Sequence, residues 1–192
     1  MKKRIQKSRF LVISFLITFT LPAWGQLSFV LSPHQYFKIE GTSTLHDWVM
    51  ESAKAEGNAK VTLENGKITG INSLSVALPV TSLKSGKNAM DKNAYAALLS
   101  EKVPEIHLEL AEIKAITDQS VKAEIKLSIA GNTRILDWDV EYFLAEEGIL
   151  FSSLQKFKFS DFQLNPPKAM FGAISTGDDL TLSFETIFES TN

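Results

Sequence analysis

The feature of this sequence that most constrains its fold is an alternation of apolar and polar residues with a period of two. Every second residue from Val121 to Ile129 is apolar, and the residues between them are Lys, Glu or Ser. Similar alternation runs through residues 136–144 and 180–188. Because successive side chains of a strand point to opposite faces, the pattern predicts antiparallel strands that bury one face each.

Turn residues separate the alternating segments. Asn65-Gly66 and Gly131-Asn132 supply the positive φ angles that tight hairpins require. About eight strands are predicted, near residues 37–39, 49–53, 59–63, 74–83, 105–113, 121–144 as a hairpin, 150–159 and 180–188. Such strands must close into a barrel or stack as two sheets, since open edges invite aggregation, and the pattern alone is compatible with both.

One segment, residues 88–110, instead indicates a helix followed directly by a strand. The apolar residues of the helix recur at helical spacing and form a narrow stripe of Met90, Ala94, Ala97 and Leu98. Asn88 and Asp91 are placed as a capping pair, and Pro104 forces its predecessor out of the helix. A helix of this kind must lay its stripe on an apolar surface, which is the mouth of a barrel or an end or edge of a sandwich.

The N-terminus has the pattern of a secretory signal. Five basic residues among the first nine precede an uncharged run, residues 10–21, and Ala23 and Gly25 are small residues at the positions that a signal peptidase reads. We therefore expect residues 1–25 to be a signal peptide that is removed after Gly25, with an uncleaved N-terminal anchor as the alternative. The run is shorter than the ~20 residues that span a bilayer, so no stable membrane insertion is expected.

Residues 26–192 are predicted to form a single domain, since no Gly/Ser or Pro-rich linker divides them. Without its first 25 residues the chain has 15 basic and 22 acidic residues, a net charge of −7. The lysines are scattered singly along the predicted strands, which argues against nucleic acid as a partner. The chain has no cysteine, so disulfides, thiolate metal sites and a lipidated cysteine are excluded.

The candidates for catalysis and metal binding are weak. Asp137 and Asp139 are two residues apart on a predicted strand, and therefore share a solvent face where a carboxyl has no reason for a raised pKa. His34, His46 and His107 show no metal-ligand spacing. We predict no catalytic residues, no metal site and no cofactor, and we leave open whether His46 forms a structural hydrogen bond or contacts a ligand.

Several stretches, taken in order along the chain, resemble the YceI-like family of lipid- or polyisoprenoid-binding domains of bacterial periplasms. The stretches that carry the resemblance are Leu45-His46-Asp47-Trp48 followed by Gly57, residues 91–108 with Pro104, residues 127–142 with Gly131 and Thr133, Phe159-Ser160-Asp161-Phe162, and Gly177-Asp178. The chain departs from the family at Val103, Leu98 and Leu99, where an aromatic residue is usual before the proline and at the helix end.

The resemblance implies an all-β protein, an extended lipocalin-like antiparallel eight-stranded β-barrel with one short helix capping a mouth. It also implies a periplasmic or secreted bacterial protein, not an enzyme, whose partner is a long-chain isoprenoid or acyl lipid held inside the barrel. The helix would then shield the lipid from water. The oligomeric state is left open.

If the barrel closes, the alternation predicts which residues face its interior. The predicted ligand-binding residues are Val76, Leu78, Ile125, Leu127, Leu136, Trp138, Val140, Tyr142, Phe157, Phe159, Leu182 and Phe184. The predicted lid at the mouth consists of Met90, Ala94, Leu98 and Phe171. A barrel of this size can instead be plugged by its own side chains, and Trp138 and Tyr142 are large enough to do so. Two alternatives therefore remain: an exported structural or interaction domain with a filled core and no ligand, and an uncharacterised hydrolase or isomerase built on the same barrel.

Overall fold

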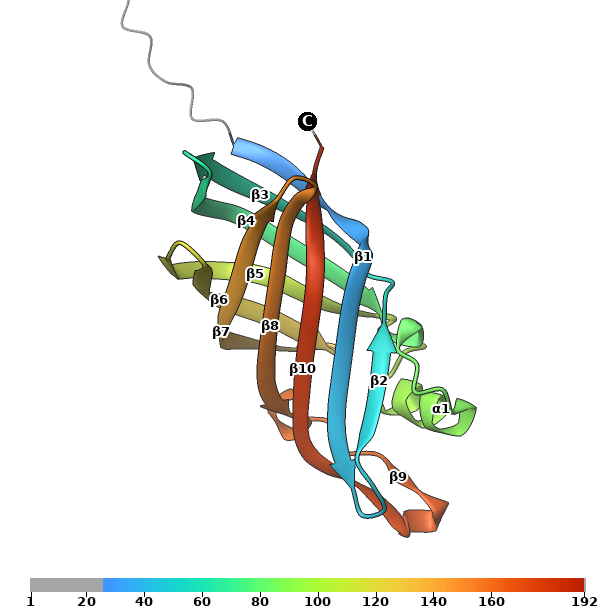
Figure 1. The fold of residues 1–192 in the computed structure, drawn as a ribbon. Helices are drawn as coiled ribbons and strands as arrows, with labels where there is room; N and C mark the ends of the chain where they lie inside the picture. The colour runs from blue at the N-terminus through green and yellow to red at the C-terminus, as the bar shows by residue number, and fades with distance from the viewer. Residues whose placement is uncertain (1–25, 192) are drawn as a thin grey trace, which may run out of the picture.

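The computed structural model describes residues 26–191 as one long, strongly curved antiparallel sheet with a single α-helix beside one end (Figure 1). The predicted signal peptide, residues 1–25, lies outside the described residues. The strands are β1 (Gln26–Ser43), β2 (Trp48–Ser52), β3 (Glu56–Glu64), β4 (Lys67–Pro79), β5 (Glu105–Ile116), β6 (Ser120–Ile129), β7 (Asn132–Ala145), β8 (Gly148–Lys158), β9 (Lys168–Ala169) and β10 (Ile174–Ser190). The helix is α1 (Asn88–Ala97), and three 3-10 turns are η1 (Val80–Ser82), η2 (Ser160–Phe162) and η3 (Met170–Gly172).

The sheet closes on itself. Its strand order is β2-β1-β3-β4-β5-β6-β7-β8-β10-β9, and β10 also pairs with β1 along most of the length of both strands. Eight long strands therefore form a closed antiparallel barrel, while the short β2 and β9 add to the edges of β1 and β10. The predicted eight-stranded barrel is confirmed, and the sandwich alternative is excluded.

Strand β1 is much longer than the sequence pattern predicts, because it begins at Gln26 rather than near residue 37. Its pairing with β10 shifts between Leu31 and Gln35, around Pro33. Proline lacks the N–H that a sheet requires, so it is tolerated where the register breaks. The break interrupts the apolar alternation and so hides the first half of the strand from a period-two analysis.

The predicted alternation determines which face each strand buries. In β6 all five apolar residues from Val121 to Ile129 are buried, and the residues between them are exposed or half-buried. In β7 Trp138 and Tyr142 are buried, whereas Asp137 and Asp139 are exposed. The barrel interior is therefore the hydrophobic core, and its burial supplies most of the favourable free energy of folding.

The two ends of helix α1 differ from the prediction. Lys87 stands at the N-cap without a side-chain hydrogen bond, so the predicted Asn88–Asp91 capping pair is wrong. Asp91 is buried and instead accepts hydrogen bonds from the backbone N–H of Ser85 at 2.8 Å and its hydroxyl at 2.6 Å. The helix ends at Ala97, and Leu99 follows in the left-handed conformation with φ 54°, before Pro104 is reached.

Candidate ligand-binding cavity

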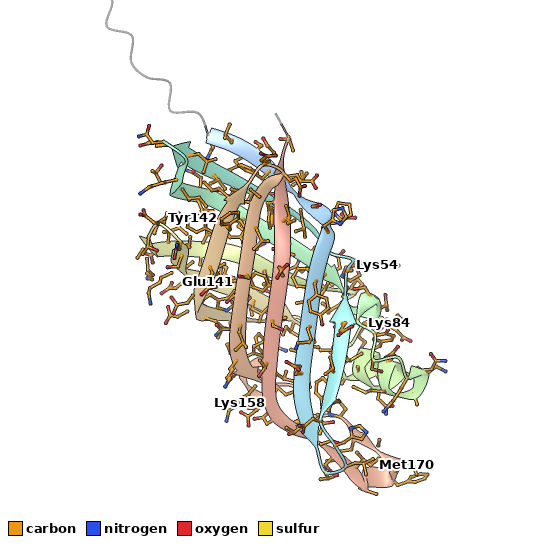
Figure 2. All side chains as sticks on the ribbon, viewed as in Figure 1. Lys54, Lys84, Glu141, Tyr142, Lys158 and Met170 are labelled. Carbon is orange, nitrogen blue, oxygen red and sulfur yellow. The ribbon has the colours of Figure 1, made fainter. Side chains whose placement is uncertain are left out.

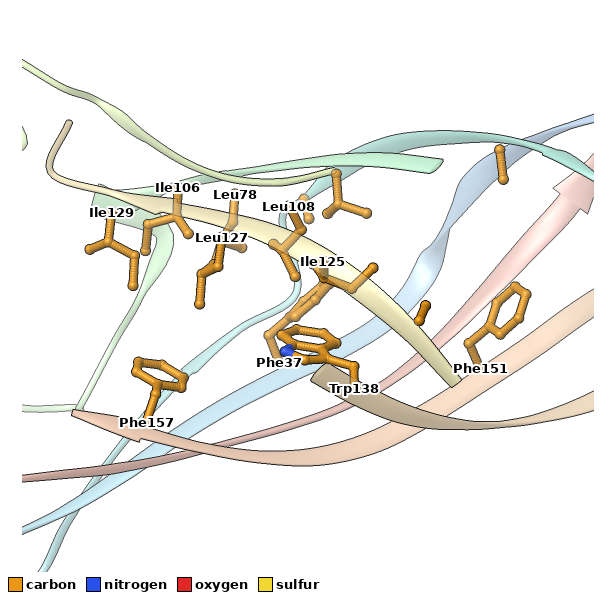
Figure 3. Close-up of a cluster of buried hydrophobic side chains, with 14 of the residues drawn as sticks. Phe37, Leu78, Ile106, Leu108, Ile125, Leu127, Ile129, Trp138, Phe151 and Phe157 are labelled. Atoms are coloured by element: carbon orange, nitrogen blue, oxygen red, sulfur yellow. The ribbon is translucent and has the colours of Figure 1, made fainter. Parts of the chain in front are cut away.

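The barrel interior contains two cavities of very different size. The larger has a volume of about 390 Å³ and lies at the end of the barrel where α1 and β9 are found. The smaller has a volume of about 70 Å³ and lies further inside. Phe37 and Leu108 line both cavities and therefore form the partition between them. In Figure 3 these two residues lie between Phe157, on the side of the large cavity, and Phe151, on the side of the small one.

The large cavity has apolar walls made by alternate residues of several strands. Five predicted interior residues line it, namely Leu78, Leu127, Phe157, Phe159 and Leu182. Three predicted lid residues, Met90, Ala94 and Leu98, line it from the helix. The stripe of α1 therefore rests on the cavity and covers part of its mouth, which is one of the surfaces that the amphipathic pattern leaves open and the one that the resemblance implies.

Five other predicted interior residues line only the small cavity, namely Val76, Ile125, Trp138, Val140 and Phe184. The ring of Trp138 stacks on Phe184 with centroids 5.8 Å apart, and Phe184 also contacts Phe37 at 6.1 Å. These aromatic contacts fill the middle of the barrel. The indole Nε1 of Trp138 has no hydrogen-bond partner among residues 26–191, an unusual cost for a buried donor.

The last three predicted residues line neither cavity. Leu136 is half-buried and packs against the core, and Tyr142 is a buried plug whose hydroxyl donates a hydrogen bond to the Thr117 carbonyl at 2.8 Å. Phe171, predicted as a lid, is fully exposed, and its neighbour Met170 lines the large cavity instead. A loop lacks the alternation that assigns faces, so the sequence could not decide which of these two neighbours points inward.

Sequence reasoning also missed part of the cavity wall. Trp48 of β2 lines the cavity, and its ring lies so close to Gly41 that a Cβ at that glycine would be 2.3 Å from it. The Trp48 Nε1 donates a hydrogen bond to the Thr42 carbonyl at 3.0 Å, which fixes the ring. Met50, two residues further along β2, is buried and also faces the cavity. In the sequence, Trp48 and Met50 are two residues apart and would therefore share a face of a strand. The strand has only five residues, which are too few to show an alternating pattern.

Helix α1 is held over the cavity by polar contacts with the loop before it. The Tyr95 hydroxyl lies 2.7 Å from the Leu83 carbonyl oxygen and accepts a hydrogen bond from Lys84 Nζ at 2.7 Å. The two hydrogen bonds from Ser85 hold the pKa of the Asp91 carboxyl below its ordinary value. The helix is therefore fixed at its first turn by Asp91 and near its end by Tyr95.

Polar groups reach the large cavity mainly at its mouth. His46, Lys87, Asn93 and Lys168 line it there, and all four residues are exposed. The Nδ1 of His46 is 2.7 Å from the Asp47 carbonyl oxygen, so this histidine forms a local hydrogen bond while its ring borders the mouth. A ligand in this cavity would thus have apolar surroundings for its body and polar surroundings at one end.

The acidic and histidine side chains considered for catalysis do not form a reacting group. Asp137 and Asp139 are exposed on the outer face, where Asp139 pairs with Lys122 at 3.0 Å. His107 is exposed and lies 3.5 Å from Glu105. Among residues 26–191, no three His, Asp or Glu side chains lie together as metal ligands would. What the cavity provides is a mainly apolar environment that opens at a polar mouth.

A membrane-spanning helix is not found in the part of the chain that the structure describes, because none of its helices is both long and apolar enough.

The geometry describes a closed antiparallel barrel that encloses an apolar cavity under a short helix. The sequence profile of the YceI-like domain matches residues 25–188, so the chain belongs to the YceI-like family. None of the curated proteins compared with the chain matches it.

Solved structures share this fold at low sequence identity. BcnA of Burkholderia cenocepacia is 12% identical with a TM-score of 0.68, over 82% of this chain and 98% of that one. A polyisoprenoid-binding domain from Saccharophagus degradans is 10% identical with a TM-score of 0.65, over 86% and 99%. The YceI protein of Campylobacter jejuni is 19% identical with a TM-score of 0.55, over 72% and 85%. At these identities the likeness establishes the barrel fold.

Proposed function

We propose that this protein binds a long apolar ligand, of the isoprenoid or fatty-acyl type, in the large cavity and carries or sequesters it in the bacterial periplasm without covalent chemistry. The observation that carries the proposal is the cavity of about 390 Å³ with apolar walls and polar groups mainly at its mouth. Family membership and the Saccharophagus degradans domain, described as polyisoprenoid-binding, support the same class of ligand.

Burial of hydrocarbon supplies the affinity in this mechanism. Each Å² of apolar surface removed from water contributes about 25 cal/mol, so a chain that fills the cavity gains more than one that only touches its mouth. Leu78, Leu127 and Leu182 would contact the middle of the chain, and Phe37 would meet its end. Met90, Ala94 and Leu98 of α1 would cover the chain after entry.

The proposal is tested by filling the cavity from the helix. Ala94→Phe places a ring where α1 lines the cavity, while Ala96→Phe places the same ring on the exposed side of the helix. We expect the wild type and Ala96→Phe to bind a fluorescent polyene fatty acid and farnesol, and Ala94→Phe to bind both at least roughly tenfold more weakly, because the ring takes space that the ligand needs. Titration of fluorescence and of its competition by farnesol measures both affinities.

Extraction of the protein from its own cells provides the independent measurement. Gentle purification followed by native mass spectrometry should show a long-chain apolar molecule on the wild type and a mass that lacks residues 1–25. Folded protein that carries no lipid and binds neither probe would favour an exported structural or interaction domain instead. Material from the periplasm that retains residues 1–25 would contradict the predicted signal cleavage.

A further inference from the structure

Three apolar side chains are exposed at the tip of the barrel where the large cavity opens. Leu45 is 66% exposed, Met170 is 71% exposed and Phe171 is fully exposed. Figure 2 shows Met170 at the extreme end of the molecule, far from Tyr142 at the other end. Leu45 and Met170 also line the cavity, so the exposed apolar surface is continuous with the cavity wall. Soluble proteins seldom gather large apolar side chains in this way unless the surface meets a partner.

The backbone holds Met170 at the cavity mouth and Phe171 outward at an energetic cost. Met170 and Phe171 have φ angles of 51° and 56°, the left-handed region that bulky residues avoid. The loop and the start of β10 that follows it are tied to Thr44: its hydroxyl donates to the Ala173 carbonyl at 3.4 Å, its N–H donates to the Ser175 carbonyl at 3.0 Å, and the Ser175 N–H donates to Thr44 Oγ1 at 3.1 Å. Leu45 and the loop of Phe171 therefore form one connected structure.

Three segments at this end differ in charge from the rest of the molecule. We define the rim as residues 42–47, 84–102 and 163–173. The rim has five lysines and three acidic residues, a net charge of +2, whereas the remainder of residues 26–191 has ten basic and nineteen acidic residues, a net charge of −9. Of the three acids, Asp91 is buried and bonded to Ser85. Three acidic residues outside the defined rim adjoin it: Asp161 accepts from the Lys158 N–H, Asp178 accepts hydrogen bonds from Ser160, and Asp179 pairs with Lys158 at 3.6 Å.

We propose that the rim docks on the surface of a membrane that contains anionic lipids, with Phe171, Met170 and Leu45 inserted among the head groups and the rim lysines on the lipid phosphates. Lys87 and Lys168 have no carboxylate partner within 4 Å among residues 26–191, so their charges are available to the lipid. The acidic remainder of the barrel is repelled by the same surface, which orients the cavity mouth toward the bilayer.

This inference goes beyond the proposed function, because it concerns where the protein meets lipid and not what the cavity holds. It predicts peripheral contact only. Burial of the exposed apolar side chains and attraction of the lysines to anionic lipid both favour binding to the membrane. Neither contribution alone should be enough for stable binding.

The test is co-flotation of the protein without residues 1–25 with two kinds of vesicle, one of phosphatidylcholine alone and one in which about a third of the lipid is phosphatidylglycerol. We expect binding to the anionic vesicles, weak binding to the neutral ones, and loss of binding at high salt. Phe171→Asn should weaken binding at least roughly tenfold, because the apolar contact is lost. Asparagine tolerates a positive φ, so the thermal unfolding midpoint of the Phe171→Asn variant should not fall.

Matched variants separate the rim from the rest of the surface. Phe143 is 67% exposed on β7 and follows Tyr142, which Figure 2 labels far from Met170, so Phe143→Asn should leave vesicle binding unchanged. Lys168→Gln should weaken binding roughly fivefold, whereas Lys126→Gln on the outer face of β6 should not. The cavity probes should still bind Phe171→Asn, so this proposal and the proposed function can fail separately.

Three results would overturn the proposal. The first is that the wild type does not bind anionic vesicles, and the second is that Phe171→Asn and Phe143→Asn bind them equally well. The third is that Phe171→Asn abolishes a dimer seen by sedimentation and leaves vesicle binding unchanged, since the exposed tip would then be an interface between copies of this chain.

Discussion

The barrel has an open half, which surrounds the large cavity, and a closed half, which surrounds the small one. Both halves are built from the same strands but are packed differently. Strand β8 passes through both. In the closed half Phe151 contacts Phe188 edge to face at 5.8 Å and Tyr142 at 6.5 Å. In the open half Phe157 packs on Phe162 at 5.6 Å and lines the large cavity. One alternating pattern therefore makes a core with only a small cavity, of about 70 Å³, in one half and a large cavity, of about 390 Å³, in the other.

The difference follows from the size of the inward side chains. Aromatic rings from β1, β7, β8 and β10 meet one another in the closed half and occupy its centre. In the open half many of the wall residues are aliphatic, among them Leu78, Ile106, Leu127 and Ile129 (Figure 3). Aliphatic residues line the small cavity as well, so what distinguishes the closed half is the set of aromatic rings that contact one another across it. The sequence leaves open whether the barrel is plugged or empty. The closed half is largely plugged by aromatic side chains, and the open half holds the large cavity.

The largest expected effect is a difference between two identical substitutions on β8. Phe151 is 5% exposed and Phe157 is 7% exposed, so both rings are buried to the same degree. Phe151 borders only the small cavity of about 70 Å³, so Phe151→Ala should lower the free energy of unfolding by about 3–5 kcal/mol, because it removes the ring contacts with Phe188 and Tyr142 and enlarges a void. Phe157→Ala should cost clearly less in the ligand-free protein, since part of its ring already faces the large cavity of about 390 Å³. Urea unfolding of both variants measures the difference.

A bound ligand sharpens the same comparison. Added farnesol should raise the unfolding midpoint of the wild type, and it should stabilise Phe157→Ala less, because that variant has lost part of the cavity wall. Equal costs of the two substitutions, with and without ligand, would show that the halves do not differ in packing.

A smaller effect on stability is expected at helix α1, which covers the open half and is held in place by polar contacts. Asp91→Ala removes the acceptor of both Ser85 hydrogen bonds and should cost about 1.5–3 kcal/mol, since the acceptor is charged and buried. Hydrogen exchange should speed up in residues 84–103 and stay slow in β6 and β7, because the closed half does not depend on the helix. Faster exchange throughout the barrel would mean that the helix supports the whole fold.

The sign of the pH dependence at Asp91 follows from its lowered pKa. A carboxyl whose pKa is lower in the folded protein stabilises the fold above its ordinary value of 3.8 and loses that contribution as pH falls toward the folded value. Acidification below pH about 4 should therefore destabilise the wild type more than Asp91→Ala. Urea midpoints measured at neutral and acidic pH check this.

The sequence could predict the closed half more fully than the open one. Alternation alone predicts that Trp138 and Ile125 face the interior, and the structure places both there. The open half depends on a two-residue strand, a five-residue strand and a loop, which are too short to show a period. Whether an inward residue borders a cavity or a neighbouring ring depends on contacts across the barrel, and a single strand's pattern does not contain them.

The smallest effect is expected on the outer face of β7, next to the buried Trp138. Asp137 is adjacent to Trp138 but points outward, is exposed and has no ion pair within 4 Å among residues 26–191. Asp137→Ala should therefore change the free energy of unfolding by under ~0.5 kcal/mol. Asp139→Ala is the matched control, and loss of its exposed pair with Lys122 at 3.0 Å should cost no more than about 1 kcal/mol. A cost at Asp137 as large as that of Phe151→Ala would show that the inward and outward faces of β7 are not energetically separate. The contrast between the two halves would then no longer belong to the interior alone.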